Sequence, residues 1–185
     1  GESSEFLVVY GRRRVGKTFL LREFFNQKFS FYHTGLSNKG MIDQLENFDY
    51  ALSKVSRVDY VHPSKNWIEA FRRLSNYLET EDKSSRKVIF IDEMPWLDTR
   101  GSDFVSGLEN FWNSWASARK DILLIACGSA IGWMTSKLIN NVGGLHNRVT
   151  AHIKLVPFTL KETEEFFKSK HIHLDQYSIV QLYMA

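Results

Sequence analysis

Apolar runs alternate with amphipathic stretches along most of the chain. The apolar runs predict five strands, at residues 6–10, 29–33, 87–91, 122–126 and 152–156. Four of these runs are nearly continuous in apolar or aromatic residues, which is typical of strands covered on both faces of a parallel sheet. The fifth alternates between polar and apolar positions, so we expect it at an edge of the sheet.

Between these runs, apolar side chains recur at helical spacing. Three stripes predict helices: Met41, Leu45, Phe48 and Leu52; Trp67, Ala70, Phe71, Leu74 and Leu78; and Phe104, Leu108, Phe111, Trp112 and Trp115. Aromatic stripes at this spacing usually belong to the core, so we interpret the tryptophans as core residues rather than as a ligand platform. The alternation of strands and helices predicts a three-layer α/β domain with right-handed crossovers.

After the fifth strand the pattern becomes helical only. Thr159 and Glu162 have the spacing of a capping box that opens one helix, and another helix begins near Asp175. We therefore predict a core domain over residues 1–157 and the first helices of a truncated helical lid over 158–185. Because the chain begins with glycine and ends within a helical pattern, we expect it to be a piece of a longer protein.

Composition adds modest constraints. A chain of 185 residues with 43% hydrophobic and 24% charged residues is typical of a globular domain. The net charge of +3 permits an anionic partner without requiring one. No apolar run reaches the roughly 18 residues of a membrane span. The single cysteine, Cys127, has no internal disulfide partner, which favours a cytoplasmic location.

The first predicted strand runs directly into a phosphate-binding pattern. Gly11, Gly16, Lys17 and Thr18 fit G-x-x-x-x-G-K-[ST], with a strand before the motif and a helix after it. The glycines let backbone N–H groups curl around phosphate oxygens, and the helix beginning at Lys17 presents its positive end to the same anion. We expect Lys17 to reach the β- and γ-phosphates and the Thr18 hydroxyl to ligate Mg²⁺.

The neighbours of this motif complete the predicted nucleotide site. Arg14, Val15 and Phe19 are expected to line it together with the motif residues. Arg12, Arg13 and Arg14 fill the variable positions of the loop. They have the chemistry to grip phosphate or a partner's anion, but a run of charges usually forms a solvated face, so we expect at least two of them to point to water.

A pair of carboxylates follows the third predicted strand. Asp92 and Glu93 end the strand within the run "KVIFIDEMPWL" and resemble a Walker B motif with an added catalytic glutamate. In such a pair Asp92 holds Mg²⁺, while Glu93 orients or deprotonates the attacking water. A solvated turn after a buried strand is the alternative, and the phosphate-binding pattern makes it the less favoured one.

Four segments together, "VVYGRRRVGKTFL", "VIFIDEMPWL", "CGSA" and "NRVTAHIKLVPFTLKE", resemble the archaeal-type ATPases, P-loop proteins of the AAA+/STAND branch. The resemblance covers about residues 6–168 and implies a five-stranded parallel sheet in the order 5-1-4-3-2 followed by a helical lid. It leaves the adenine-contacting residues and a second sensor arginine unassigned.

The resemblance also implies roles for two further residues. Ser129 ends the strand "ILLIACGSA", which resembles the sensor strand, where a hydroxyl bonds the γ-phosphate or the lytic water. Capping of the helix that starts near Ala130 is an equally weighted alternative. Arg148 precedes the fifth strand and resembles the arginine that completes a neighbouring subunit's ATP site, which would imply self-association. A surface arginine or a structural ion pair is the alternative.

The leading hypothesis is an ATPase, with ATP and Mg²⁺ as cofactors, that acts as a conformational switch or motor module of a larger protein. A nucleotide-dependent binding module with little hydrolysis and a P-loop small-molecule kinase are the alternatives. A GTP-binding switch is not favoured, because "NKGM" lacks the final Asp of the N-K-x-D motif and has Met41 instead. DNA association through domains outside this chain rests on family analogy alone.

Overall fold

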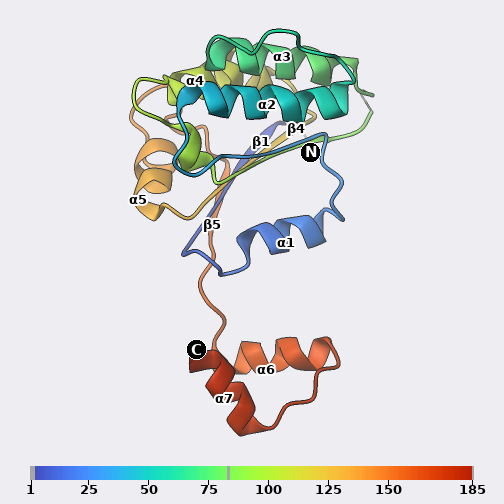
Figure 1. Ribbon diagram of the computed structural model, residues 1–185, viewed down its shortest axis with the longest axis vertical. Helices are drawn as coiled ribbons and strands as arrows, with labels where there is room; N and C mark the ends of the chain where they lie inside the picture. Colours follow the sequence, from blue (N-terminus) through green and yellow to red (C-terminus); the bar gives the residue numbers. More distant parts are fainter. Residues whose placement is uncertain (1–2, 83, 185) are drawn as a thin grey trace.

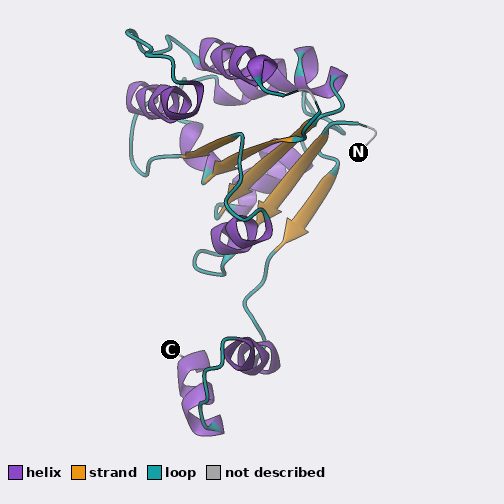
Figure 2. Ribbon diagram, turned by 90° about the vertical axis from the view of Figure 1, so that its right-hand side faces the viewer, coloured by secondary structure: helices purple, strands orange, loops and turns teal. Residues whose placement is uncertain are grey.

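A parallel sheet forms the centre of the computed structural model, which describes residues 3–82 and 84–184 (Figures 1 and 2). Its strands are β1 (Glu5–Tyr10), β2 (Phe31–Thr34), β3 (Lys87–Asp92), β4 (Ile122–Gly128) and β5 (Ala151–Lys154). All neighbouring strands pair in parallel, in the spatial order β2-β3-β4-β1-β5. This confirms the α/β class and the predicted order 5-1-4-3-2.

Helices cover the two faces of the sheet unequally. The helices α2 (Met41–Ser56), α3 (Trp67–Thr80) and α4 (Phe104–Ser114) lie on one face, and α1 (Lys17–Phe24) lies on the other (Figure 1). The strand order explains this, because the β1-to-β2 connection crosses the sheet in one direction and the later connections cross in the other. Right-handed crossovers in opposite directions must pass over opposite faces.

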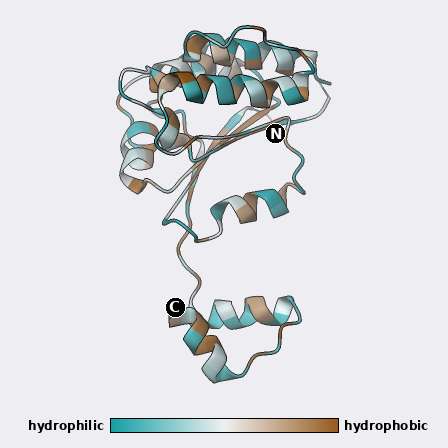
Figure 3. Ribbon diagram, in the orientation of Figure 1, coloured by the Kyte–Doolittle hydropathy of each residue, from teal (hydrophilic) through white to brown (hydrophobic). Residues whose placement is uncertain are grey.

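The main core lies between the sheet and the three-helix layer. Trp67 and Trp112 are 1% and 3% exposed within it, which confirms their interpretation as core residues. Trp115 is partly buried and donates its indole N–H to Glu79. Along these helices hydrophobic and hydrophilic residues alternate, as Figure 3 shows by colour. A smaller cluster under α1 contains Val9, Leu21, Phe90, Ile125 and Cys127.

Strand boundaries differ slightly from the prediction at both sheet edges. β2 begins at Phe31 rather than at residue 29, and β5 spans Ala151–Lys154 rather than residues 152–156. The amide of Leu155 still donates to the Tyr10 carbonyl at 2.7 Å, but Pro157 has no N–H to extend the ladder. β5 pairs only with β1, which confirms the predicted edge position.

Shorter elements complete the core. They are η1 (Met94–Leu97), η2 (Ala116–Ala118), α5 (Ile131–Trp133) and the π-helix η3 (Met134–Ile139). The hydrophobic pattern of the sequence did not indicate the π-helix.

After β5, residues 155–159 connect the sheet to two further helices. These are α6 (Leu160–Ser169) and α7 (Gln176–Met184), which contact each other and lie apart from the sheet in Figures 1 and 2. Thr159 and Glu162 form the predicted capping box at the start of α6. Across the described ranges, no helix combines the length and apolar character that crossing a membrane requires.

Candidate functional site

Three neighbouring strands deliver the candidate residues to one edge of the sheet. β1 leads into the loop of residues 11–16, β3 ends at Asp92 and leads into Glu93, and β4 is followed by Ser129. Because parallel strands end at a common edge, residues far apart in sequence converge there.

The loop of residues 11–16 turns tightly between β1 and α1. Gly16 has a φ of 87° and Arg14 a φ of 65°, both in the left-handed region. α1 then begins at Lys17, so its N-terminal amides face the inside of the turn. At Gly11 the constraint is space, because an added Cβ would lie 2.1 Å from the Leu155 carbonyl oxygen. Gly16 thus has the left-handed backbone of a tight turn, while Gly11 is required by the close approach of Leu155.

Lys17 places its charge inside the turn. The residue is only 5% exposed, and its Nζ donates to the carbonyl oxygens of Gly11 at 3.1 Å and Arg12 at 2.8 Å. These two bonds orient the ammonium group toward the concave side of the loop. An anion held by the loop amides would therefore meet a positive charge that is already positioned.

Thr18 and Asp92 meet across the gap between α1 and β3. The Thr18 hydroxyl donates to Asp92 Oδ2 at 2.7 Å, and Asp92 is 4% exposed. Asp92 Oδ1 accepts the Glu93 amide at 2.9 Å, which fixes the second oxygen. Burial, together with this nearby carboxylate, raises the pKa of the Cys127 thiol and so favours its protonated form.

The same pair offers suitable ligands for Mg²⁺. A hydroxyl and a carboxylate are hard oxygen donors, and Mg²⁺ usually takes one or two carboxylates and completes its shell with substrate phosphates and water. Within residues 3–82 and 84–184, no group of three or more His, Cys, Asp or Glu side chains is placed to hold a metal ion. The residues therefore fit a cation that arrives with a phosphate ligand, rather than one caged by protein alone.

Glu93 and Ser129 are linked directly. Ser129 donates to Glu93 Oε2 through its hydroxyl at 3.0 Å and its amide at 3.3 Å. Glu93 itself has a φ of 44°, the left-handed region that costs energy for a residue with a side chain. The N-cap of α5 is Ala130, without a side-chain cap. Ser129 therefore does not cap this helix, and the capping alternative was wrong.

A pocket of about 530 Å³ opens over these groups. It is lined by Arg13, Arg14, Gly16, Lys17, Thr18, Phe19, Glu93 and Trp96. Phe19 is 53% exposed at its wall, and Val15 is half-buried in the loop beside it. Six of the predicted residues line this pocket: Arg14, Gly16, Lys17, Thr18, Phe19 and Glu93. Gly11, Val15, Asp92 and Ser129 are not among its lining residues, and Trp96 lines it without having been predicted. Its position three residues after Glu93 was the available signal.

Arg148 lies at the other end of the sheet. It is exposed in the turn before β5, whose first residue pairs with Leu7 near the start of β1, whereas the glycine loop follows the end of β1. No carboxylate lies within 4.0 Å of Arg148 in the part of the chain that the structure describes. Arg148 is therefore not part of this chain's own pocket, and the structural ion-pair alternative finds no support there.

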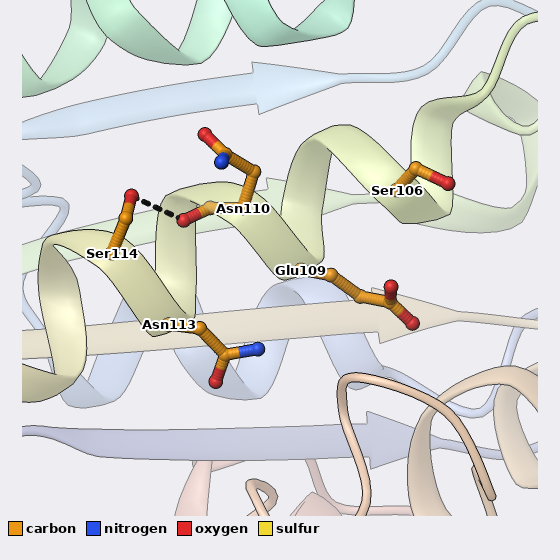
Figure 4. Close-up of a pocket in the computed structure, with 5 residues that line it drawn as sticks. All are labelled: Ser106, Glu109, Asn110, Asn113 and Ser114. Carbon is orange, nitrogen blue, oxygen red and sulfur yellow. Dashed lines mark hydrogen bonds between the residues drawn. The ribbon is translucent and has the colours of Figure 1, made fainter.

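A second hollow of about 510 Å³ lies on α4 (Figure 4). All of its lining residues come from this one helix: Ser106, Glu109, Asn110, Asn113 and Ser114. Ser114 bonds the carbonyl of Asn110 within the helix, and Asn113 donates to the Gly144 carbonyl at 2.7 Å. The one charge in this hollow is the carboxylate of Glu109, which repels phosphate. The hollow therefore lacks the chemistry of the glycine-loop pocket.

Residues 1–178 match a family model described as an ATPase domain predominantly from Archaea. An uncharacterized protein of Methanocaldococcus jannaschii is 32% identical over 165 residues, which cover 88% of this chain and 34% of that protein. The chain thus spans about a third of the length of this curated relative.

Solved structures share the fold at low sequence identity. A Walker-type ATPase of Pyrococcus abyssi matches 97% of this chain and 57% of its own, with 17% identity and a TM-score of 0.65. The Aeropyrum pernix ORC1 protein, solved in complex with DNA, matches 92% of this chain and 44% of its own, with 15% identity and a TM-score of 0.63. A STAND protein of Pyrococcus horikoshii with a tetratricopeptide repeat sensor matches 98% and 25%, with 15% identity and a TM-score of 0.54.

Proposed function

The chain belongs to the family of ATPase domains found predominantly in Archaea, and from this premise we propose that it binds ATP with Mg²⁺ and hydrolyses it to drive a conformational switch or motor module of a longer protein. The observation that carries the proposal is the convergence of Lys17, Thr18, Asp92 and Glu93 beside the glycine loop and its pocket. The hollow on α4, by comparison, is lined by one carboxylate and no cation.

The loop and the first turn of α1 bind the phosphates in this proposal. The loop amides supply the hydrogen-bond donors, and the N-terminus of α1 adds its partial positive charge. Lys17 exchanges its bonds to the loop carbonyls for bonds to the β- and γ-phosphates, which as charge-assisted bonds are the stronger ones. Phe19, exposed at the wall, offers an apolar surface to the nucleotide.

Hydrolysis requires a water molecule aligned with the γ-phosphorus. The water oxygen forms a bond to that phosphorus, the bond to the bridging oxygen breaks, and ADP keeps the electron pair. We assign Glu93 to orient this water and accept its proton, which later returns to solvent, and Ser129 to hold the Glu93 carboxylate. Thr18 and Asp92 would hold Mg²⁺, which supplies charge neutralisation on the phosphates.

The helices α6 and α7 are the proposed output of the switch. They form the first part of a lid over residues 158–185 that closes when ATP is bound and reopens after loss of the γ-phosphate. Arg148 would act on the ATP of a second copy, because it lies at the opposite end of the sheet from its own chain's pocket.

One observation favours a second candidate, a binding module that holds ATP with little turnover. Both donors of Ser129 occupy Glu93 Oε2, and this oxygen must leave at least one of them before it can accept a hydrogen bond from water in the same place. If Glu93 stays bonded when ATP is bound, hydrolysis is slow and occupancy alone is the signal.

The test is ATP binding and phosphate release by the full protein and by two variants. We expect Lys17→Ala to abolish ATP binding, whereas Glu93→Gln keeps binding and lowers turnover by about 100-fold or more. Lys28→Ala and Glu23→Gln are matched controls at exposed positions outside the pocket. Turnover at the wild-type rate in both pocket variants would refute the assignment, and slow release unchanged by Glu93→Gln would favour the binding module.

DNA association and a cytoplasmic location are further proposals. ORC1 of Aeropyrum pernix was solved with DNA, and any DNA contact of this protein would come through domains outside this chain. Such binding should weaken steeply as salt increases, because phosphate contacts release counterions. A filter-binding titration of the full protein at several salt concentrations measures this.

A further inference from the structure

An arginine and a tryptophan without a role so far stack on each other at the wall of the pocket. The guanidinium carbon of Arg13 lies 5.3 Å from the centre of the Trp96 ring, within the range of a cation–π interaction. Both residues line the pocket together with Lys17 and Glu93. Arg13 is therefore held on the side of the pocket where η1 follows Glu93.

The position of Trp96 is fixed by its backbone. Its amide donates to the Glu93 carbonyl at 3.0 Å, and its own carbonyl accepts from Gln44 Nε2 at 3.0 Å. Gln44 is fully buried and also bonds both backbone groups of Leu36. On another side, a Cβ added to Gly35 would come within 3.2 Å of the Trp96 Cβ. The ring is thus carried by a rigid turn.

The charge of Arg13 is not neutralised by the protein. Two other stacked arginines have a carboxylate partner: Arg73, over Tyr60, bonds Asp49, and Arg119, over Trp115, bonds Asp121. No carboxylate lies within 4.0 Å of Arg13 in residues 3–82 and 84–184. An exposed guanidinium at the wall of a phosphate pocket is therefore available to an anionic ligand.

We propose that Arg13, positioned by Trp96, contacts the terminal phosphate and makes the site prefer a nucleoside triphosphate over the diphosphate. The inference rests on the proposed function, in which Glu93 orients the water that attacks the γ-phosphorus. The γ-phosphate then lies beside Glu93, and the Arg13–Trp96 pair is tied to Glu93 by the bond from the Trp96 amide to the Glu93 carbonyl. The planar guanidinium suits two phosphate oxygens at once.

Arg13 and Lys17 differ in what they distinguish. In the proposed function Lys17 bonds the β-phosphate as well as the γ-phosphate, so its removal weakens the binding of both ATP and ADP. In our proposal Arg13 contacts the γ-phosphate alone, which ADP lacks. The ratio of ATP affinity to ADP affinity therefore isolates the role of Arg13.

The experiment is calorimetric titration of the full protein with ATP and with ADP in the presence of magnesium. A Glu93→Gln background keeps the bound ATP intact. We expect Arg13→Ala to weaken ATP binding about tenfold or more, because a charge-assisted bond is lost, and to leave ADP affinity within about twofold. Arg13→Lys should fall between, since it keeps the charge but loses the planar fork.

Trp96 is tested as a positioning residue through coupling. Trp96→Ala should lower the ATP-to-ADP ratio in the same direction, and the double variant with Arg13→Ala should lose little more than Arg13→Ala alone. Trp96→Phe keeps an aromatic ring and should keep most of the preference. Arg22→Ala is the matched control, because Arg22 stacks on Tyr32 at 5.0 Å outside the pocket; its ratio should equal that of the parent.

Each outcome has a defined meaning. An unchanged ratio in Arg13→Ala, or equal losses for ATP and ADP, overturns the inference even when Lys17→Ala has abolished binding. A parent protein that binds neither nucleotide refutes the proposed function instead. If Trp96→Ala unfolds, as thermal melting would reveal, the exposed Arg13→Ala and the conservative Trp96→Phe still decide the question.

Discussion

At Gly11 the chain approaches itself too closely for any side chain. A Cβ added at this position would lie 2.1 Å from a backbone oxygen of Leu155, and a backbone atom cannot rotate away. We therefore expect Gly11→Ala to displace either the glycine loop or the segment after β5, lowering the free energy of unfolding by about 2 kcal/mol and weakening ATP binding. Urea denaturation and ATP titration measure the two effects.

The control for this prediction is Gly132→Ala. An added Cβ there has no heavy atom within 4 Å, and the position is helical, so stability should stay constant or rise slightly. Equal stability of Gly11→Ala and the wild type would show that the loop does not depend on this close approach.

Ser129 carries the second prediction at the residue scale. Ser129→Ala removes the hydroxyl that bonds Glu93 Oε2 at 3.0 Å, so the carboxylate loses its orientation. We expect steady-state ATP turnover to fall about tenfold with KM unchanged, since a hydrogen bond to a charged group of this kind is worth about 1.5–3 kcal/mol. Ser129→Thr should restore most of the rate. Faster turnover in Ser129→Ala would mean that the serine restrains the glutamate instead.

At the scale of elements, Asp49 ties two helices and their connection together. From α2 it accepts the amide and hydroxyl of Ser64 at 2.5 and 2.9 Å and a guanidinium N–H of Arg73 at 3.2 Å. Asp49→Ala would leave these donors without their partner in a largely buried place. We expect a loss of about 2–3 kcal/mol in the free energy of unfolding, measured with urea.

Glu164→Ala is the control for the Asp49 prediction. Glu164 bonds Lys168 on the exposed side of α6, and surface pairs of this kind contribute little. The unfolding transition should therefore stay where it is. If Asp49→Ala also unfolds at the same urea concentration as the wild type, apolar packing alone joins α2 to α3.

The elements also show how far the sequence could be interpreted. Apolar runs predicted the existence of every strand, because buried parallel strands need apolar residues on both faces. These runs do not indicate which strands lie next to each other in the sheet, so the predicted strand order came from the family resemblance. The contact between Glu93 and Ser129 joins residues 36 apart and depends on that order. Trp96 was not predicted, because its place in the pocket depends on how η1 folds after Glu93.

At the scale of the whole molecule, one histidine makes stability depend on pH. His33 is 2% exposed, and burial lowers its pKa from 6.5 to about 3. Between pH 3 and 6.5, His33 is therefore protonated in the unfolded chain and neutral in the folded chain. The free energy of unfolding is therefore unaffected by His33 above pH 6.5. It decreases as the pH falls from 6.5 toward 3, by no more than about 1.4 kcal/mol per pH unit.

Urea unfolding between about pH 7.5 and 5 checks this prediction above the range in which carboxylates titrate. His33→Phe should flatten the dependence. Nε2 of His33 has no hydrogen-bond partner among the described residues, so the substitution leaves no donor or acceptor orphaned. Identical pH slopes in the wild type and His33→Phe would assign the effect to other groups.

The path out of the sheet also has a mechanical consequence. Leu155 bonds the last residue of β1 through its amide, and its carbonyl oxygen lies close to Gly11, so the segment that leads to α6 and α7 adjoins the glycine loop directly. Tension applied to α6 and α7 would reach the protein first at Leu155, before it reaches the paired residues of β5 and β1. A load on the C-terminal helices, such as optical tweezers impose, should therefore change how long the nucleotide stays bound.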